Sequence, residues 1–159
     1  MTKFPISSGS PSLFIGNDFL YSEKEHRLWI LNFSTDGKII GMVEGFSEVG
    51  PRALGNRSII CDPSIDGMKD ILNAKVKFRE WFRPFAPVCR LEDKDKYFNK
   101  AYESEFMSYA PSVKEKFKQE LKTVTHKDNT TRLQTVTKEQ HSTFYSILSE
   151  LDKLNEIPV

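Results

Sequence analysis

The feature that most constrains the fold of this chain is the order of its apolar segments. Short apolar runs at residues 28–33, 38–43 and 58–61 alternate with two longer stretches in which apolar residues recur every three or four positions. The short runs predict strands, and the periodic stretches predict amphipathic helices. Interleaved strands and helices indicate an α/β domain, with α+β as the alternative.

The two periodic stretches predict the longest helices. The first covers residues 64–75, with Asp62 and Pro63 as start signals, and the second covers residues 138–154. Their inward-facing residues are Met68, Ile71, Leu72 and Val76 in the first helix, and Phe144, Ile147, Leu148, Leu151 and Leu154 in the second. Weaker patterns predict a polar helix at 91–99, a strand at 106–110, a solvated helix at 113–121, a strand at 130–136, and an extended segment at 82–88.

The size of the chain fits one domain. Its 159 residues, 38% of them hydrophobic, can bury one core but are few for two. Ser, Gly and Pro are frequent near the start, so we expect a poorly structured segment over 1–27 and the domain over 28–159. No apolar run approaches the roughly 18 residues that cross a bilayer, and Cys61 and Cys89 have no disulfide-type spacing. These features predict a cytoplasmic protein without membrane partners.

Charge is unevenly distributed along the chain. The net charge is only +1, which makes nucleic acid an unlikely partner on electrostatic grounds. Residues 50–90, however, hold eight basic and four acidic side chains, and five of the seven arginines lie there. This local excess indicates an anion-binding site.

Residues 50–58, Gly-Pro-Arg-Ala-Leu-Gly-Asn-Arg-Ser, form a candidate anion-binding loop. The glycines would let backbone amides approach a ligand, while Arg52 and Arg57 offer planar groups that match phosphate or carboxylate oxygens. Asn56 and Ser58 add neutral donors. The spacing is neither that of a P-loop nor that of a dinucleotide-binding fingerprint. The alternative is a tight turn whose arginines point to solvent or pair with nearby carboxylates, namely Glu48 and Asp62.

Residues 75–79 alternate cations with apolar side chains. An extended backbone would place Lys75, Lys77 and Arg79 on one face, whereas a helix would align only the first and last of them. The aromatic residues that follow are expected in the core, with a nucleobase platform as the alternative: Phe78, Trp81, Phe82 and Phe85. Arg83 and Arg132 stand in apolar or β-branched runs, and each needs a partner if it is buried.

The three histidines give no metal-site spacing. His26, His126 and His141 are not separated by four residues, and neither cysteine has a neighbouring ligand. We therefore expect no metal held by this chain alone. His126 with Asp128 is a candidate acid–base pair, and a turn is the alternative.

Taken together, these motifs resemble the C-terminal domain of the NodU/CmcH/TobZ-type O-carbamoyltransferases. The resemblance rests first on the run from Gly45 to Ile59 and on the basic and aromatic segment from Lys75 to Pro87. Shorter matches are Asp62-Pro63, Met68-Lys69, Leu72-Asn73, Thr125-His126-Lys127-Asp128 and Thr131-Arg132-Leu133-Gln134-Thr135-Val136. The similarity covers about residues 28–159.

The resemblance implies a YrdC-like twisted sheet with packed helices that binds ATP with Mg²⁺ and carbamoyl phosphate and forms carbamoyl adenylate. It places Arg52, Lys77 and Arg83 as catalytic residues, with Arg132 as a further phosphate-binding cation. Other residues that match the family's motif and are expected at the binding site are Arg57, Ser58, Lys75 and Arg79.

The family pattern also extends beyond this sequence. Relatives carry a Kae1-like domain, which holds iron or another metal and transfers the carbamoyl group to a hydroxyl acceptor. They also continue past Val159 into a strand that helps to bind ATP, so a C-terminal truncation is expected. A Kae1-like domain or chain is therefore an expected partner. The alternatives are a nucleotide- or RNA-binding module without catalysis, or a structural remnant of a carbamoyltransferase.

Overall fold

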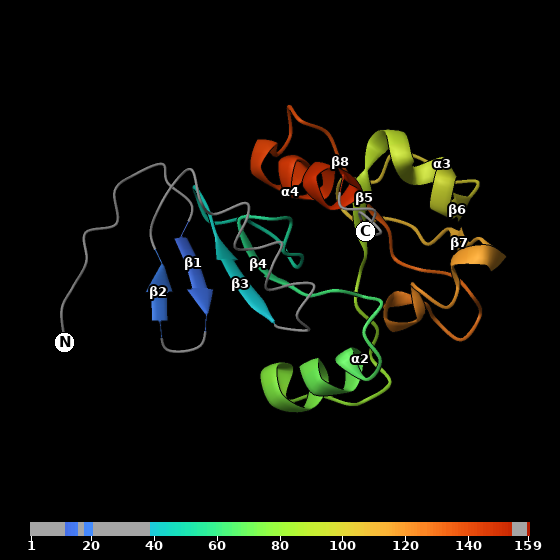
Figure 1. The fold of residues 1–159 in the computed structure, drawn as a ribbon. Helices are drawn as coiled ribbons and strands as arrows, with labels where there is room; N and C mark the ends of the chain where they lie inside the picture. The colour runs from blue at the N-terminus through green and yellow to red at the C-terminus, as the bar shows by residue number, and fades with distance from the viewer. Residues whose placement is uncertain (1–11, 16–17, 21–38, 154–158) are drawn as a thin grey trace.

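The computed structural model describes residues 12–15, 18–20, 39–153 and 159. In these residues the chain has a mixed α/β fold, with three α-helices and three small sheets (Figure 1). The predicted mixing of helices and strands is confirmed. None of the helices in the described part of the chain is long and apolar enough to cross a membrane.

The largest sheet is antiparallel and has the strand order β2-β1-β3-β4. Strands β3 (Ile40–Val43) and β4 (Arg57–Ile60) confirm two of the predicted strands, with Ile40 opposite Ile60. Strands β1 (Ser12–Ile15) and β2 (Asp18–Leu20) lie within the segment predicted to be poorly structured, and there the chain is extended and paired instead. The strand predicted at 28–33 lies outside the described residues.

Helix α4 (Ser142–Lys153) packs on this sheet and forms one of the two cores. Ile40 and Met42 alternate inward from β3 and meet Phe144 and Ile147 of α4. The predicted apolar face is thus confirmed, but the helix begins four residues later than expected. Thr137 and Gln140 bond each other's backbone N–H groups, at 2.8 and 3.3 Å, and hold a turn before the helix.

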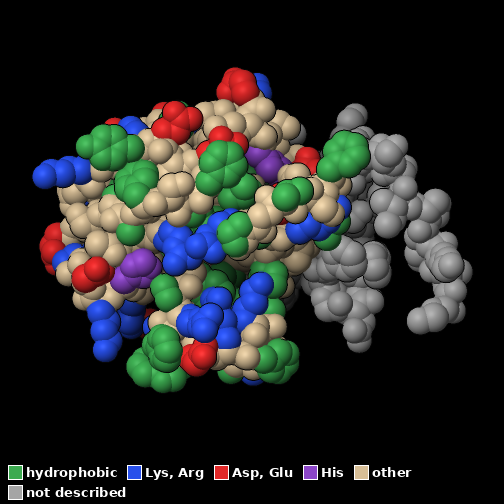
Figure 2. Space-filling view, turned by 180° about the vertical axis from the view of Figure 1, so that it is seen from behind, with side chains coloured by type: hydrophobic (Ala, Val, Ile, Leu, Met, Phe, Trp, Pro, Cys, Tyr) green, Lys and Arg blue, Asp and Glu red, His purple; other side chains and the backbone are tan. Residues whose placement is uncertain are grey.

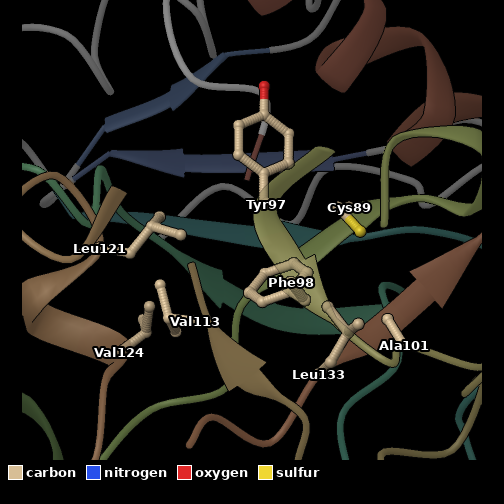
Figure 3. Close-up of a cluster of buried hydrophobic side chains, with 8 residues drawn as sticks. All are labelled: Cys89, Tyr97, Phe98, Ala101, Val113, Leu121, Val124 and Leu133. Atoms are coloured by element: carbon tan, nitrogen blue, oxygen red, sulfur yellow. The ribbon is translucent and has the colours of Figure 1, made fainter. Parts of the chain in front are cut away.

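The second core lies around the parallel pair β5 (Val88–Arg90) and β8 (Gln134–Val136) and the antiparallel pair β6 (Phe98–Asn99) and β7 (Ser112–Val113). Between β5 and β6 the chain forms a 3-10 turn, η2 (Leu91–Asp93), and the short helix α3 (Lys94–Tyr97). Figure 3 shows the buried side chains of this core: Cys89, Tyr97, Phe98, Ala101, Val113, Leu121, Val124 and Leu133.

Several predicted elements differ from the structure, among them the helix expected at 91–99, which ends at Tyr97 because Phe98 and Asn99 pair in β6. The helix expected at 64–75 starts only at α2 (Met68–Ile71), because Gly67 has a left-handed backbone (φ 77°), and it continues as a π-helical turn, η1 (Leu72–Lys77). Residues 106–110 form no strand. The helix expected at 113–121 is replaced by the 3-10 turn η3 (Glu115–Phe117), followed by η4 (Lys122–Val124), because Val113 is already paired in β7.

Candidate functional site

A cavity of about 540 Å³ is the principal candidate site. Its walls come from residues 51–53, 58–64 and 84–88, from Glu120, Thr123 and Val124, and from the inner face of α4. Five of the predicted site residues line it: Arg52, Ser58, Lys77, Arg79 and Arg132. The volume lies in the range of small-molecule sites. Figure 2 shows Lys and Arg side chains gathered near the middle of one face of the molecule.

Arg52 lies at the tip of the predicted anion-binding loop. Its side chain is exposed, and within the described residues its guanidinium makes one long contact, 3.4 Å, with the carbonyl of Pro51. Ser58 lies deeper, and its hydroxyl accepts a hydrogen bond from the Gly55 N–H at 2.9 Å. Arg52 therefore lines the cavity from this loop, whereas the hydroxyl of Ser58 stabilises the loop backbone.

Arg57 does not line the cavity, although the sequence places it beside Arg52. Its guanidinium donates hydrogen bonds to the carbonyls of Glu44, Gly45 and Asn56 at 2.7, 3.0 and 2.7 Å. These bonds join the two sides of the loop that connects β3 and β4. Arg57 is therefore a structural cation in this arrangement.

Lys77 and Arg79 reach the cavity from the end of the π-helical turn. The backbone here is helical and then left-handed at Phe78 (φ 48°), so the extended alternative for residues 75–79 is wrong. Arg79 donates from Nε to Asn73 Oδ1 at 2.7 Å, and its guanidinium lies 4.5 Å from the centre of the Phe85 ring. Burial and then the nearby Arg83 lower the pKa of Arg79. Lys75 is exposed and is not among the lining residues.

Arg83 lies outside the main cavity. It forms an exposed ion pair with Glu80, with Nε 2.7 Å from the carboxylate, and lines a smaller open hollow beside Phe78 and Arg79. The sequence indicated that Arg83 needs a partner if it is buried. In the structure Arg83 is exposed, and its partner is the Glu80 carboxylate. The structure does not bring Arg83 together with Arg52 and Arg132 in one cavity.

Arg132 reaches the cavity because the backbone turns sharply at this residue. The N–H of Leu133 donates to the carbonyl of Thr131 at 3.0 Å, which closes a three-residue turn with Arg132 at its centre. Thr131 and Leu133 are buried, while Arg132 is exposed. The strand predicted over 130–136 is therefore limited to β8, and the break presents a cation to the cavity.

The aromatic residues after the π-helical turn are not in the core as predicted. Phe78, Trp81 and Phe82 are 82%, 66% and 60% exposed, and only Phe85 packs partly against the second core. The side chain of the buried Asn73 explains this conformation, because its amide donates to the carbonyls of Trp81 and Arg83 at 3.2 and 2.9 Å. Residues 78–83 thus form a fixed loop with exposed aromatic side chains.

His126 lies in a turn and does not line the cavity. Its Nδ1 is 2.9 Å from the hydroxyl of Thr130, and its backbone N–H donates to the Thr130 carbonyl. Asp128 accepts two hydrogen bonds from Thr130, which lower its pKa. The turn alternative therefore describes this segment, and His126 is not among the residues that line the cavity.

Sequence reasoning missed several cavity residues. Asp62 and Glu120 bring carboxylates to its wall, and the side chains of Phe144 and Leu148 form part of an apolar floor. Cys61 also lines it, but burial and then Asp62 raise the pKa of its thiol to about 12, which makes it a poor nucleophile. Glu120 stands in the segment predicted to be a solvated helix, so no sequence signal placed it at the site.

Cations from three separate segments thus converge on one cavity of a mixed α/β domain. The family described as Carbamoyltransferase C-terminus matches residues 32–159. The chain therefore belongs to the carbamoyltransferase C-terminal family.

Individual relatives agree with this assignment. Nodulation protein NolNO of Sinorhizobium fredii is 42% identical over 127 residues, which are 78% of this chain and 19% of the relative. A 3'-hydroxymethylcephem-O-carbamoyltransferase of Streptomyces clavuligerus is 42% identical over 71% of this chain and 21% of its own length. Nodulation protein U of Azorhizobium caulinodans is 36% identical over 78% of this chain and 22% of its own length. The chain thus spans about a fifth of the length of these relatives.

Proposed function

We propose that this chain is an ATP- and carbamoyl-phosphate-binding module that forms carbamoyl adenylate for transfer to a hydroxyl acceptor. The observation that carries the proposal is the convergence of Arg52, Lys77, Arg79 and Arg132 on one cavity. ATP and carbamoyl phosphate together bring many negative charges, and these must be neutralised before an anionic oxygen can approach the α-phosphorus. Membership in the carbamoyltransferase C-terminal family supports the same assignment.

In the proposed reaction, water first converts carbamoyl phosphate to carbamate and inorganic phosphate. A carbamate oxygen then forms a bond to the α-phosphorus of ATP, and the bond to the β-phosphate breaks to release pyrophosphate. Arg52 and Arg132 would bind phosphate oxygens in pairs from opposite walls, and Lys77 would add a point charge. Both arginines are exposed side chains at the cavity.

Mg²⁺ is proposed to arrive with the triphosphate. This ion is usually held by one or two carboxylates together with substrate phosphates, and Asp62 and Glu120 are the carboxylates that line the cavity. Bound there, the ion would offset charge on the phosphate oxygens. The hydroxyl acceptor would react on a Kae1-like domain or chain, and any iron or other metal would belong to that part.

We expect substitutions in the cavity to weaken binding. Replacing Arg52 or Arg132 by Ala should raise the dissociation constant for ATP by about tenfold to a hundredfold, because each removes a charge-assisted hydrogen bond contributing roughly 1.5–3 kcal/mol. Isothermal titration calorimetry with Mg²⁺ present measures this. Lys127→Ala, at an exposed cation outside the cavity, is the matched control and should bind like the unchanged protein. Equal effects of all three changes would contradict the assigned site.

Ligand-dependent stability and chemistry test the whole proposal. At about 100 times its dissociation constant, a ligand stabilises the folded state by about 2.7 kcal/mol, or roughly 5–10 °C in Tm. ATP and carbamoyl phosphate should each give such a shift. Exchange of labelled pyrophosphate into ATP, dependent on carbamoyl phosphate, then reports adenylate formation. Binding without exchange would limit the function of this chain to binding. If neither ligand shifts Tm, the result would support the alternative that the chain is a structural remnant of a carbamoyltransferase.

One observation favours a second candidate function. Exposed aromatic rings next to cations are what proteins use to bind single-stranded nucleic acid, and residues 78–83 present three such rings. A non-catalytic nucleotide- or RNA-binding module would use this loop instead of the cavity. The two functions therefore depend on different side chains and can be separated by substitution.

A further inference from the structure

The loop that carries Arg52 has little packing to hold its shape. Val49, Pro51 and Arg52 are exposed, so the apolar side chain of Val49 contributes no packing to the loop. A loop with few apolar contacts depends mainly on hydrogen bonds for its conformation. Three of the bonds that it forms converge on one side chain, that of Glu48, while Asn56 Nδ2 donates to the carbonyl of Phe46 at 3.0 Å and Gln134 Nε2 donates to that of Leu54 at 3.4 Å.

Glu48 accepts hydrogen bonds from three backbone N–H groups on the far side of the loop. Its Oε1 lies 2.7 Å from the N–H nitrogen of Leu54 and 2.8 Å from that of Asn56, and its Oε2 lies 3.2 Å from that of Arg57. Hydrogen bonds to a carboxylate are stronger than those between neutral groups. The carboxylate therefore closes the chain from residue 48 to residue 54, with Arg52 in the enclosed turn.

Other contacts fix the base of the same loop but do not reach its tip. The N–H of Glu44 donates to the carbonyl of Asn56 at 2.8 Å, and the Arg57 guanidinium binds the carbonyls of Glu44 and Gly45. These bonds extend the pairing of β3 with β4. Glu48 is the next link outward, between this base and the turn that presents Arg52 to the cavity.

We infer that Glu48 is a positioning residue, which acts on the ligand through Arg52 and not by its own charge. This inference rests on the proposed function. Both carboxylate oxygens are already occupied by backbone donors, so Glu48 has little capacity to bind a ligand itself. A guanidinium that is held in place loses less freedom on binding than one on a loose loop, so affinity depends on the brace.

Glu48→Gln and Glu48→Asp separate geometry from charge. Gln keeps an oxygen at the position that bonds Leu54 and Asn56, and we expect its dissociation constant for Mg²⁺·ATP to stay within about threefold of the unchanged protein. Asp keeps the charge but is one methylene too short, and we expect about tenfold weaker binding. The reverse order would overturn the inference. Glu139→Gln, in the exposed turn before α4, is the control for loss of a carboxylate.

A double-substitution cycle shows whether Glu48 acts through Arg52. In the Arg52→Ala background, we expect Glu48→Asp to cause no further loss of ATP affinity, because the group that it positions is gone. The same tenfold loss in both backgrounds would overturn the inference, since it would indicate a general effect on the fold. Calorimetric titration of the four proteins provides the cycle.

Hydrogen exchange gives a second readout that needs no ligand. The amides of Leu54, Asn56 and Arg57 should exchange about tenfold faster in Glu48→Asp than in the unchanged protein, whereas amides of α4 should not change. If the unchanged protein binds neither ATP nor carbamoyl phosphate, the proposed function fails, and this measurement still decides whether Glu48 braces the loop. If these three amides exchange at the same rates in Glu48→Asp as in the unchanged protein, Glu48 does not brace the loop.

Discussion

Gly55 is the residue at which the anion-binding loop touches the helix beneath it. Its backbone is left-handed (φ 122°), and a Cβ placed there would lie 2.6 Å from Cδ2 of His141 and 3.3 Å from Cδ1 of Phe144. We therefore expect Gly55→Ala to destabilise the protein by about 2–4 kcal/mol, from backbone strain together with the steric clash. Thermal unfolding should show a fall in Tm of roughly 4–16 °C.

Gly50 provides the matched control for this prediction. It has a similar backbone conformation (φ 127°), but no heavy atom lies within 4 Å of where its Cβ would be. Gly50→Ala should therefore show the cost of backbone strain alone, about 1–2 kcal/mol. If both substitutions lower Tm equally, the contact between Gly55 and His141 contributes nothing to stability.

At the scale of single residues, the sequence predicted which side chains are cationic but not where they point. Arg52 and Arg132 line the cavity, whereas Arg57 binds carbonyls and Arg83 pairs with Glu80. All four look alike in the sequence, since each follows or precedes apolar or small residues. Arg57 is held by the carbonyl of Glu44, 13 residues away in the sequence, and no local pattern encodes this contact.

At the scale of elements, the last turn of α4 is joined to β5 by an ion pair between Asp152 and Arg90. Arg90 donates from Nη2 to Asp152 at 2.8 Å and from Nε to Asp93 at 2.5 Å. Burial alone would lower the pKa of Arg90, but its bonds to Asp93 and Asp152 raise it. The hydrogen bond from Arg90 in turn lowers the pKa of Asp152. This contact ties the two cores together through the helix.

We expect Asp152→Asn to reduce stability at pH 7 by about 0.5–1 kcal/mol, a small value because the carboxylate is 40% exposed and screened by solvent. The folded-state pKa is lowered, so the ion pair stabilises the protein above the ordinary Asp value of about 4 and is lost as the pH falls through the folded-state value. The difference in Tm between the two proteins should therefore close below about pH 4.

A neighbouring carboxylate on the same helix is the control for this pH dependence. Glu150 pairs only with the exposed Lys153, at 2.6 Å, within the described residues. Glu150→Gln should change stability by less than about 0.5 kcal/mol at any pH. A pH-independent effect of Asp152→Asn would show that the amide disturbs packing and that the ion pair is not the cause.

The strong periodicity of α4 made that helix predictable, whereas several short elements set by long-range contacts were not. The apolar stripe of α4 fixed both its existence and its buried face. By contrast, residues 106–110 have the composition of a strand, but the segment before them is held by Ser104, whose N–H donates to the Thr135 hydroxyl at 2.8 Å, and Met107 is left-handed (φ 55°). Such long-range bonds decide the short elements of this chain.

At the scale of the whole molecule, the net charge and the local charge lead to different expectations for ligands. A chain with a net charge of +1 has no general attraction for a polyanion, yet four cations line one cavity. A small, highly charged ligand can use the cavity, whereas a polynucleotide would need a long cationic surface. Stacking of bases on the exposed aromatic loop at residues 78–83 would offset the lack of a long cationic surface for RNA.

Replacing the three exposed aromatic residues separates the two candidate functions. Phe78→Ser, Trp81→Ser and Phe82→Ser together should leave the affinity for Mg²⁺·ATP within about threefold of the unchanged protein, because none of the three lines the cavity. Any binding of a 12-residue oligouridylate should be lost, since each stacked base contributes about 1–3 kcal/mol.

Titrations at about 50 and 200 mM salt add a second criterion. ATP binding should weaken modestly, whereas RNA binding through its phosphates should fall by orders of magnitude. Tight, salt-sensitive RNA binding that survives Arg52→Ala and disappears with the aromatic side chains would place the function on the loop, and the cations of the cavity would then need another explanation.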